Sequence, residues 1–138
     1  MVKYGIPSDI TVSLEWAKKL KEAGWLQDGA LFCWWLRIGH TEYELSPAIF
    51  LKNGEFAAPT AEEILRRLPE AIKYPVRNAI EYELFIRPFD DSDERHWEVI
   101  YAKDIDNVDN TPLHETTGTL ANAAAAMYCY LADNKLLP

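Results

Sequence analysis

Two segments in the middle of the chain alternate apolar and polar side chains with the two-residue period of a β-strand. In residues 81–87 and 96–102, one face is aromatic or branched throughout, with Tyr82, Leu84, Ile86, Trp97, Val99 and Tyr101. The connection between the segments, Pro88 to Arg95, is short and rich in acids. The pattern therefore predicts an antiparallel hairpin with an exposed acidic loop, and this hairpin requires a sheet with at least one covered face.

The first periodic segment is helical. Apolar residues recur at helical spacing from Val12 to Ala23, and charged residues occupy the other positions. Either Thr11 or Ser13 can accept the first free backbone amides, and Gly24 can adopt the left-handed conformation that ends a helix. The segment predicts an amphipathic helix laid on a core.

Two later segments are also predicted to be helices. Thr60 to Pro69 opens with Thr60-Ala61-Glu62-Glu63, in which the threonine and Glu63 can cap each other's backbone amides. Leu120 to Leu131 follows Thr119, a suitable N-cap residue, and its many alanines allow close approach to a sheet.

Further strands are expected between the first two helices. Ala30 to Ile38 is nearly apolar on both faces, which is typical of a covered strand, and Glu42 to Leu45 is predicted to form a second strand after a turn. Pro47 places that strand at an edge or an end, because proline lacks the donor that an inner strand needs. A short return strand around Phe56 is also compatible with the pattern.

The elements follow the order α-β-β-α-β-β-α, and residues 70–79 and Asp104 to Gly118 are expected to be irregular connections. Consecutive hairpins covered by helices predict an α+β fold, with an antiparallel sheet of about four strands and helices on one face. The chain has 138 residues, of which 49% are hydrophobic, so we expect a single domain over residues 1–138 with its own core.

Adjacent tryptophans mark the third segment. Trp34 and Trp35 must point to opposite faces if Ala30 to Ile38 is a strand. One of them is expected in the core, while the other lies either under further structure or in an exposed aromatic patch. The sequence leaves both alternatives open.

The two cysteines and the apolar runs bear on the cell compartment. Cys33 and Cys129 lie far apart in apolar segments, which predicts free, buried thiols rather than a disulfide framework. The longest apolar runs are shorter than a membrane span, and residues 1–7 lack the apolar centre of a signal peptide. We therefore expect a cytoplasmic protein without membrane contact.

The net charge of −8 comes from one part of the chain. From Glu81 to Glu115 there are eleven acidic and three basic residues, whereas the rest of the chain has eleven of each. This concentration of negative charge repels phosphate groups. It therefore argues against direct nucleic-acid binding and favours a protein partner or self-association. The candidate interaction surface consists of the acids of the two expected loops: Asp90, Asp91, Asp93, Glu94, Asp104, Asp106 and Asp109. The alternative is a solvated region that only keeps the protein soluble.

Motifs for catalysis, metal binding or cofactor binding do not emerge. The stretch from Asp104 to Glu115 has the acids of a calcium loop, but Val108 occupies a ligand position and Asp109 replaces the required glycine. The three histidines have no metal-ligand spacing, and the six glycines are isolated rather than clustered as in a phosphate-binding loop. We expect no catalytic residue, no metal site and no cofactor.

Four segments together resemble a group of small bacterial proteins of unassigned function found in bacteriophage, prophage and mobile-element regions. The shared pattern is a Lys-rich first helix, an aromatic strand, a capped short helix and a final helix with a Tyr-Leu-x-x-Asn tail, here Leu14 to Gly24, Leu31 to Trp35, Thr60 to Pro69 and Leu120 to Leu137. The resemblance implies a phage or mobile-element origin, and the group has no known activity that could be assigned to residues of this chain. The second half is also similar in topology to the small sheet-and-helix domain of HicB-type antitoxins.

These observations favour a non-enzymatic protein that acts by binding another protein. The alternative is a small enzyme or ligand-binding protein whose site is assembled in space from residues far apart in the sequence.

Overall fold

The computed structural model describes residues 10–36, 39–48, 55–74, 80–91, 94–104 and 112–138, and of residues 89–91 and 94–95 it describes the backbone only. Within these residues the elements follow one another as α1 (Leu14–Glu22), β1 (Phe32–Leu36), β2 (Tyr43–Pro47), β3 (Phe56–Ala57), α2 (Ala61–Leu65), β4 (Ala71–Tyr74), β5 (Ile80–Asp91), β6 (Glu94–Ala102), β7 (His114–Gly118) and α3 (Leu120–Asp133).

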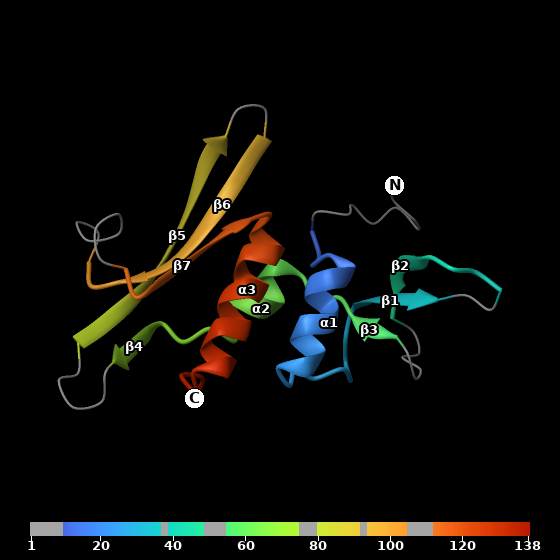
Figure 1. Ribbon diagram of the computed structural model, residues 1–138, viewed down its shortest axis with the longest axis horizontal. Helices are drawn as coiled ribbons and strands as arrows, with labels where there is room; N and C mark the ends of the chain where they lie inside the picture. The colour runs from blue at the N-terminus through green and yellow to red at the C-terminus, as the bar shows by residue number, and fades with distance from the viewer. Residues whose placement is uncertain (1–9, 37–38, 49–54, 75–79, 92–93, 105–111) are drawn as a thin grey trace.

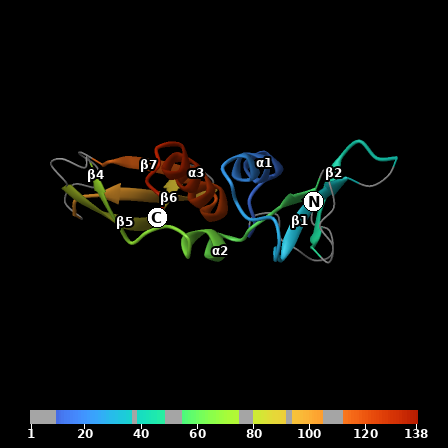
Figure 2. The same ribbon diagram turned by 90° about the horizontal axis from the view of Figure 1, so that it is seen from below.

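The helices form a layer between two antiparallel sheets (Figures 1 and 2). One sheet has the strand order β4-β5-β6-β7, and the other has the order β2-β1-β3. Helix α3 packs on β6 and β7 on one side and on α1 and α2 on the other, while α1 contacts β3. The predicted α+β class with antiparallel pairing is confirmed. The strands are divided between two sheets, however, and do not form one sheet of about four.

Helix α3 can occupy the middle layer because its alanines leave room on more than one side. Ala121, Ala124 and Ala125 belong to the core shared with α1 and the three-stranded sheet. Met127 and Leu131 belong to the core shared with the four-stranded sheet. All five residues are fully buried. A helix that is apolar on opposite sides is stable only when both sides are covered, and this arrangement covers them.

The predicted helix boundaries depend on caps that the structure contains. The Ser13 hydroxyl, rather than that of Thr11, accepts a hydrogen bond from the backbone amide of Trp16, at 3.4 Å. The Thr60 hydroxyl accepts a hydrogen bond from the Glu63 amide at 3.2 Å, and the Glu63 carboxylate accepts one from the Thr60 amide at 3.0 Å. Gly24 follows α1 with φ +96°, a conformation that other residues rarely adopt. These local predictions are confirmed.

The predicted hairpin is present, and it is longer than expected. The even-numbered residues of β5 lie opposite the odd-numbered residues of β6, with the pairs Leu84–Tyr101, Ile86–Val99 and Pro88–Trp97. Pairing continues to Asp91 and Glu94. The prediction of an exposed loop from Pro88 to Arg95 is therefore wrong, because most of that segment is paired strand.

Strands β4 and β7 lie in segments that were expected to be irregular. In β4 only Ile72 is buried, so the segment has no apolar repeat. In β7 the inward-facing residues are polar, and the Thr116 hydroxyl donates a hydrogen bond to the Ala123 carbonyl of α3 at 2.6 Å. Neither strand has the apolar alternation on which the prediction relied, and both are held by backbone pairing to their neighbours.

The adjacent tryptophans of β1 point to opposite faces, as expected. Trp34 packs against the core that includes α1, and its indole N–H donates to the Val12 carbonyl at 3.0 Å. Trp35 lies on the other face and is half-buried. Pro47 ends β2, which is an edge strand of its sheet, as its proline predicted.

Candidate interaction surface

The candidate acids lie at the two ends of β6. Asp90 and Asp91 end β5, and Glu94 begins β6 directly opposite Asp91. Asp104 is exposed and follows the other end of β6. The remaining candidates lie outside the described residues: Asp93, Asp106 and Asp109. The expected calcium-like stretch also falls largely outside them.

The described candidate acids at the two ends of β6 are far apart along the strand. An extended strand rises by about 3.3 Å per residue, so the span of β6 from Glu94 to Ala102 separates its ends by about 26 Å. The candidate acids that the structure describes therefore do not form one continuous surface. Proximity in the sequence concealed this, because the acids flank a strand whose length could not be read from its charges.

An apolar strip connects the two ends along β5. From Ile80 to Pro88 the residues on the α3-facing side of this strand are all apolar or aromatic, and we call them the β5 strip: Ile80, Tyr82, Leu84, Ile86 and Pro88. Ile80 is 36% exposed and Ile86 is 40% exposed, while Tyr82 and Leu84 are half-buried. Sequence reasoning placed these residues in a covered face. The strip is instead partly open, because α3 lies mainly over β6 and β7.

Cross-strand neighbours extend the strip at both ends. Tyr74 of β4 pairs with Ile80 and is 43% exposed, and Trp97 of β6 pairs with Pro88 and is half-buried. Directly paired residues of neighbouring strands lie on the same face of a sheet, so Tyr74 is on the α3 side with Ile80. The apolar row thus runs along the α3 side of the sheet from Ile80 to Pro88, and its middle residues, Tyr82 and Leu84, are packed against the core that includes Met127.

The opposite face of the four-stranded sheet has a different character. Glu81, Glu83 and Glu115 are exposed there, and Arg87 forms an ion pair with Glu98 at 3.0 Å. Acids therefore occur on the far side of the hairpin as well as at its ends. The face is not purely solvated, because it also buries two residues of β6 completely, Ile100 and Ala102.

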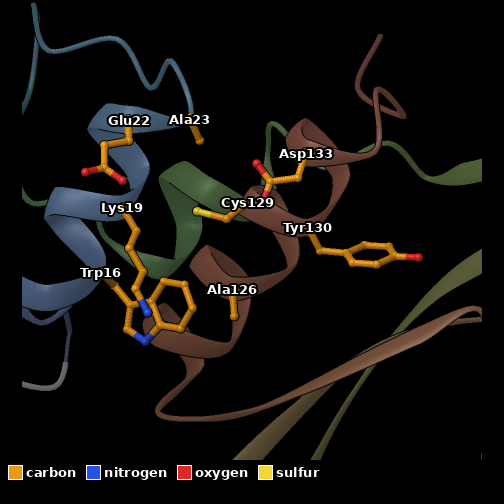
Figure 3. A pocket seen from close by; sticks show the side chains of 8 residues that line it. All are labelled: Trp16, Lys19, Glu22, Ala23, Ala126, Cys129, Tyr130 and Asp133. Carbon is orange, nitrogen blue, oxygen red and sulfur yellow. The ribbon is translucent and has the colours of Figure 1, made fainter.

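A pocket of about 500 Å³ lies between α1 and α3 (Figure 3). Its lining includes Trp16 and Lys19 of α1 and Ala126, Cys129 and Tyr130 of α3. Figure 3 shows the sulfur of Cys129 directed toward α1 and the phenol of Tyr130 directed away from it. The Lys19 ammonium lies 4.4 Å from the centre of the Trp16 ring, which it partly covers.

Cys129 is the one thiol in this pocket lining, and it is a poor nucleophile. Burial, followed by the negative charge of Asp133, raises the pKa of the thiol to about 11. A thiolate is the reactive form of cysteine, so this environment suppresses covalent chemistry near neutral pH. The pocket therefore offers a binding surface rather than a catalytic one.

The raised pKa leads to a prediction about alkaline pH. The folded state holds the Cys129 thiol proton more tightly than the unfolded chain, in which the pKa is 9.0. The protonated thiol therefore contributes its full share to the free energy of unfolding below about pH 9, and this contribution is lost as the pH rises toward 11. In a Cys33→Ala variant at pH 8, Cys129 should react with a disulfide reagent about 100-fold more slowly than the same chain unfolded in urea. Equal rates in the folded and unfolded protein would contradict the assigned environment.

The remaining chemical groups do not assemble into a further site within the described residues. His114 stacks on Tyr130 with ring centres 3.7 Å apart, and burial lowers the pKa of this histidine. Across the described ranges, no group of three or more His, Cys, Asp or Glu residues is arranged to hold a metal ion. In the same ranges, no helix has the length and apolar character needed to cross a membrane.

Comparisons with known proteins give the surface no precedent: no protein-family model, no curated protein and no solved structure matches the chain.

Proposed function

We propose that this chain is a cytoplasmic, non-enzymatic protein of phage or mobile-element origin that binds a basic partner protein through its β5–β6 hairpin. The proposal of origin rests on the sequence resemblance alone. The proposal of protein binding rests mainly on one observation, the length of the hairpin relative to its neighbours.

The hairpin extends beyond the rest of its sheet. Strand β4 pairs only with the first residues of β5, up to Glu83, and β7 pairs with β6 only from Trp97 to Tyr101. Residues 89–91 and 94–96 therefore pair only with each other in the described structure. Figure 1 shows this part of the hairpin projecting past α3.

A projecting two-stranded ribbon contributes little to folding, because such a ribbon is only marginally stable without further packing. Its tip, residues 90–95, carries four acids and a single base, Arg95, which lies opposite Asp90, so the negative charge is only partly balanced. Binding of a partner whose basic residues neutralise the acids would explain both the projection of the ribbon and its negative charge. Attraction of opposite charges would speed the encounter and would weaken with increasing salt.

Neutralising the acids at the tip should abolish partner capture. In pull-down from the bacterium that encodes the protein, tagged wild-type chain and an Asp90→Asn, Asp91→Asn, Asp93→Asn, Glu94→Gln variant would be compared. The matched control removes four exposed charges elsewhere, with Asp28→Asn, Glu42→Gln, Glu62→Gln and Glu70→Gln. We expect the control to retain a basic partner that the tip variant loses. Equal capture by both variants would refute the proposal.

A second candidate function is the binding of a small molecule in the pocket between α1 and α3, which its volume of about 500 Å³ allows. Replacing Ala126 by leucine would reduce that volume without changing the hairpin. A small-molecule binder should lose its ligand in this variant, whereas a protein binder that uses the hairpin should keep its partner.

A further inference from the structure

We propose that the pocket between α1 and α3 binds a small organic cation, a protonated amine on an apolar body, with the amine held at the carboxylates of Glu22 and Asp133. The apolar body would lie toward Trp16 and Ala126. This inference rests on the second candidate function, since it names the class of molecule that the pocket would take.

The two helices run in the same direction and end at the same side of the pocket (Figure 1). At their starts, the Ser13 amide donates to the Asn122 side chain at 2.9 Å. At their ends, Glu22 is the last residue of α1 and Asp133 is the last residue of α3, and both line the pocket. The C-terminal end of a helix carries partial negative charge, so the backbone adds to the charge of both carboxylates.

Neighbouring groups do not neutralise these two carboxylates. In the part of the chain that the structure describes, Glu22 and Asp133 have no hydrogen-bond or ion-pair partner. Among the lining residues in Figure 3 the basic one is Lys19, whose ammonium is paired with Glu15 at 3.2 Å. Figure 3 shows the Lys19 side chain running toward Trp16 and away from Glu22. The acidic end of the pocket therefore keeps a negative charge that a bound cation would neutralise.

The thiol of Cys129 reports the sign of this charge, because it lines the pocket with both acids. Burial is the main cause of its raised pKa, and the negative charge of Asp133 is the next. Lys19 lowers the pKa by less than Asp133 raises it, and Glu22 adds a further rise. The net field at the sulfur is therefore negative, and such a field attracts a positive group.

Several properties of the pocket favour an organic cation over a metal ion. Within the described ranges, no three His, Cys, Asp or Glu residues are arranged to hold a metal ion, although Glu22, Cys129 and Asp133 share this lining. The volume of about 500 Å³ lies in the range of small-molecule sites, which is about 300–1,000 Å³. An ammonium group donates up to about three hydrogen bonds, and carboxylates accept them. The indole of Trp16 and the methyl group of Ala126 would contact the apolar body.

The test compares probes of similar shape that differ in charge. Near neutral pH tryptamine is a cation, 3-ethylindole is neutral and indole-3-propionate is an anion. Hexylamine and hexanoate give the same contrast on an aliphatic body. Dissociation constants are measured by isothermal titration calorimetry on the full chain. We expect each amine to bind at least about tenfold more tightly than the neutral or anionic probes with the same kind of body.

The variant Glu22→Gln, Asp133→Asn removes both charges and keeps the size of the side chains. It should weaken tryptamine binding about tenfold or more and leave 3-ethylindole binding unchanged. It should be at least as stable as the wild type, because acids at helix C-termini are unfavourable. The matched control is Asp28→Asn, Glu42→Gln, which removes two exposed acids outside the pocket lining and should bind tryptamine as the wild type does.

Cys129 shows whether the probe lies in the pocket. In a Cys33→Ala variant it is the remaining thiol, so an occupant of the pocket should shield it. Tryptamine at about ten times its dissociation constant should slow the reaction of Cys129 with a disulfide reagent about tenfold. The variant Ala126→Leu, which reduces the pocket volume, should abolish tryptamine binding.

Three outcomes would overturn the inference. Equal or tighter binding of the neutral or anionic probes would refute a cation site, while small-molecule binding in the pocket would stand. Tryptamine binding that survives Ala126→Leu and leaves Cys129 unshielded would place the probe elsewhere and would count against the second candidate function as well. Absence of binding by both amines at millimolar concentrations would refute the cation site directly.

Discussion

Replacing Met127 by alanine should lower the free energy of unfolding by about 2–5 kcal/mol, as expected for a large side chain removed from a packed core. Met127 is fully buried and belongs to the core between α3 and the four-stranded sheet. Val99, Tyr101 and Leu131 are fully buried in the same core, so their close packing leaves them little freedom to close the cavity. Urea denaturation monitored by circular dichroism would measure the loss.

The control for this prediction is Leu36→Ala in β1, where the side chain is 42% exposed. A substitution at such a surface position should change the free energy of unfolding by less than about 0.5 kcal/mol. If Met127→Ala and Leu36→Ala were equally mild, the central position of α3 between the two sheets would be wrong.

Replacing Ile100 by alanine should cost about 2–4 kcal/mol, and Val99→Ala should cost a comparable amount. Adjacent residues of a strand point to opposite faces, yet both side chains are fully buried. Ile100 packs with Ala102 and Phe85 on the face away from α3. The four-stranded sheet should therefore lose stability from truncation on either face.

Two further substitutions in β5 provide the contrast, again by urea denaturation. Leu84→Ala should cost less than Val99→Ala, because Leu84 is only half-buried. Glu83→Gln should have almost no effect, since its side chain is exposed and surface carboxylates contribute little to folding. A loss at Glu83 equal to that at Ile100 would mean that the strand is shifted by one residue.

Local patterns predicted local structure well. The capping box at Thr60 and the apolar alternation along β5 and β6 could be predicted directly, because the residues concerned specify their own geometry, whereas the register that pairs Leu84 with Tyr101 was not predicted. The polar strand β7 could not, because it is held by pairing to β6 and by the bond from Thr116 to α3, which depend on residues distant in the sequence.

Longer-range arrangement was less accessible. Alternation along a strand shows that a face is apolar and does not show which sheet the strand joins, so the division into two sheets was missed. The openness of Ile86 was missed for a related reason, since it depends on where α3 lies and not on the residues of β5. The sequence signal for this arrangement was the run of alanines in α3, because a helix that is apolar on several sides must be covered from more than one direction. In the structure these alanines are fully buried.

The central position of α3 also governs the order in which the protein can fold during synthesis. The core around α1 and the three-stranded sheet is incomplete without Ala121, Ala124 and Ala125. The amide of Ser13 at the start of α1 donates to the Asn122 side chain at 2.9 Å, a bond between residues 109 positions apart. Ribosomes make the N-terminal part of a chain first, so α1 and its sheet emerge long before α3 and must wait with apolar surface uncovered. We expect nascent chains that stop before residue 120 to be sensitive to protease, and protection to appear only after α3 has left the exit tunnel.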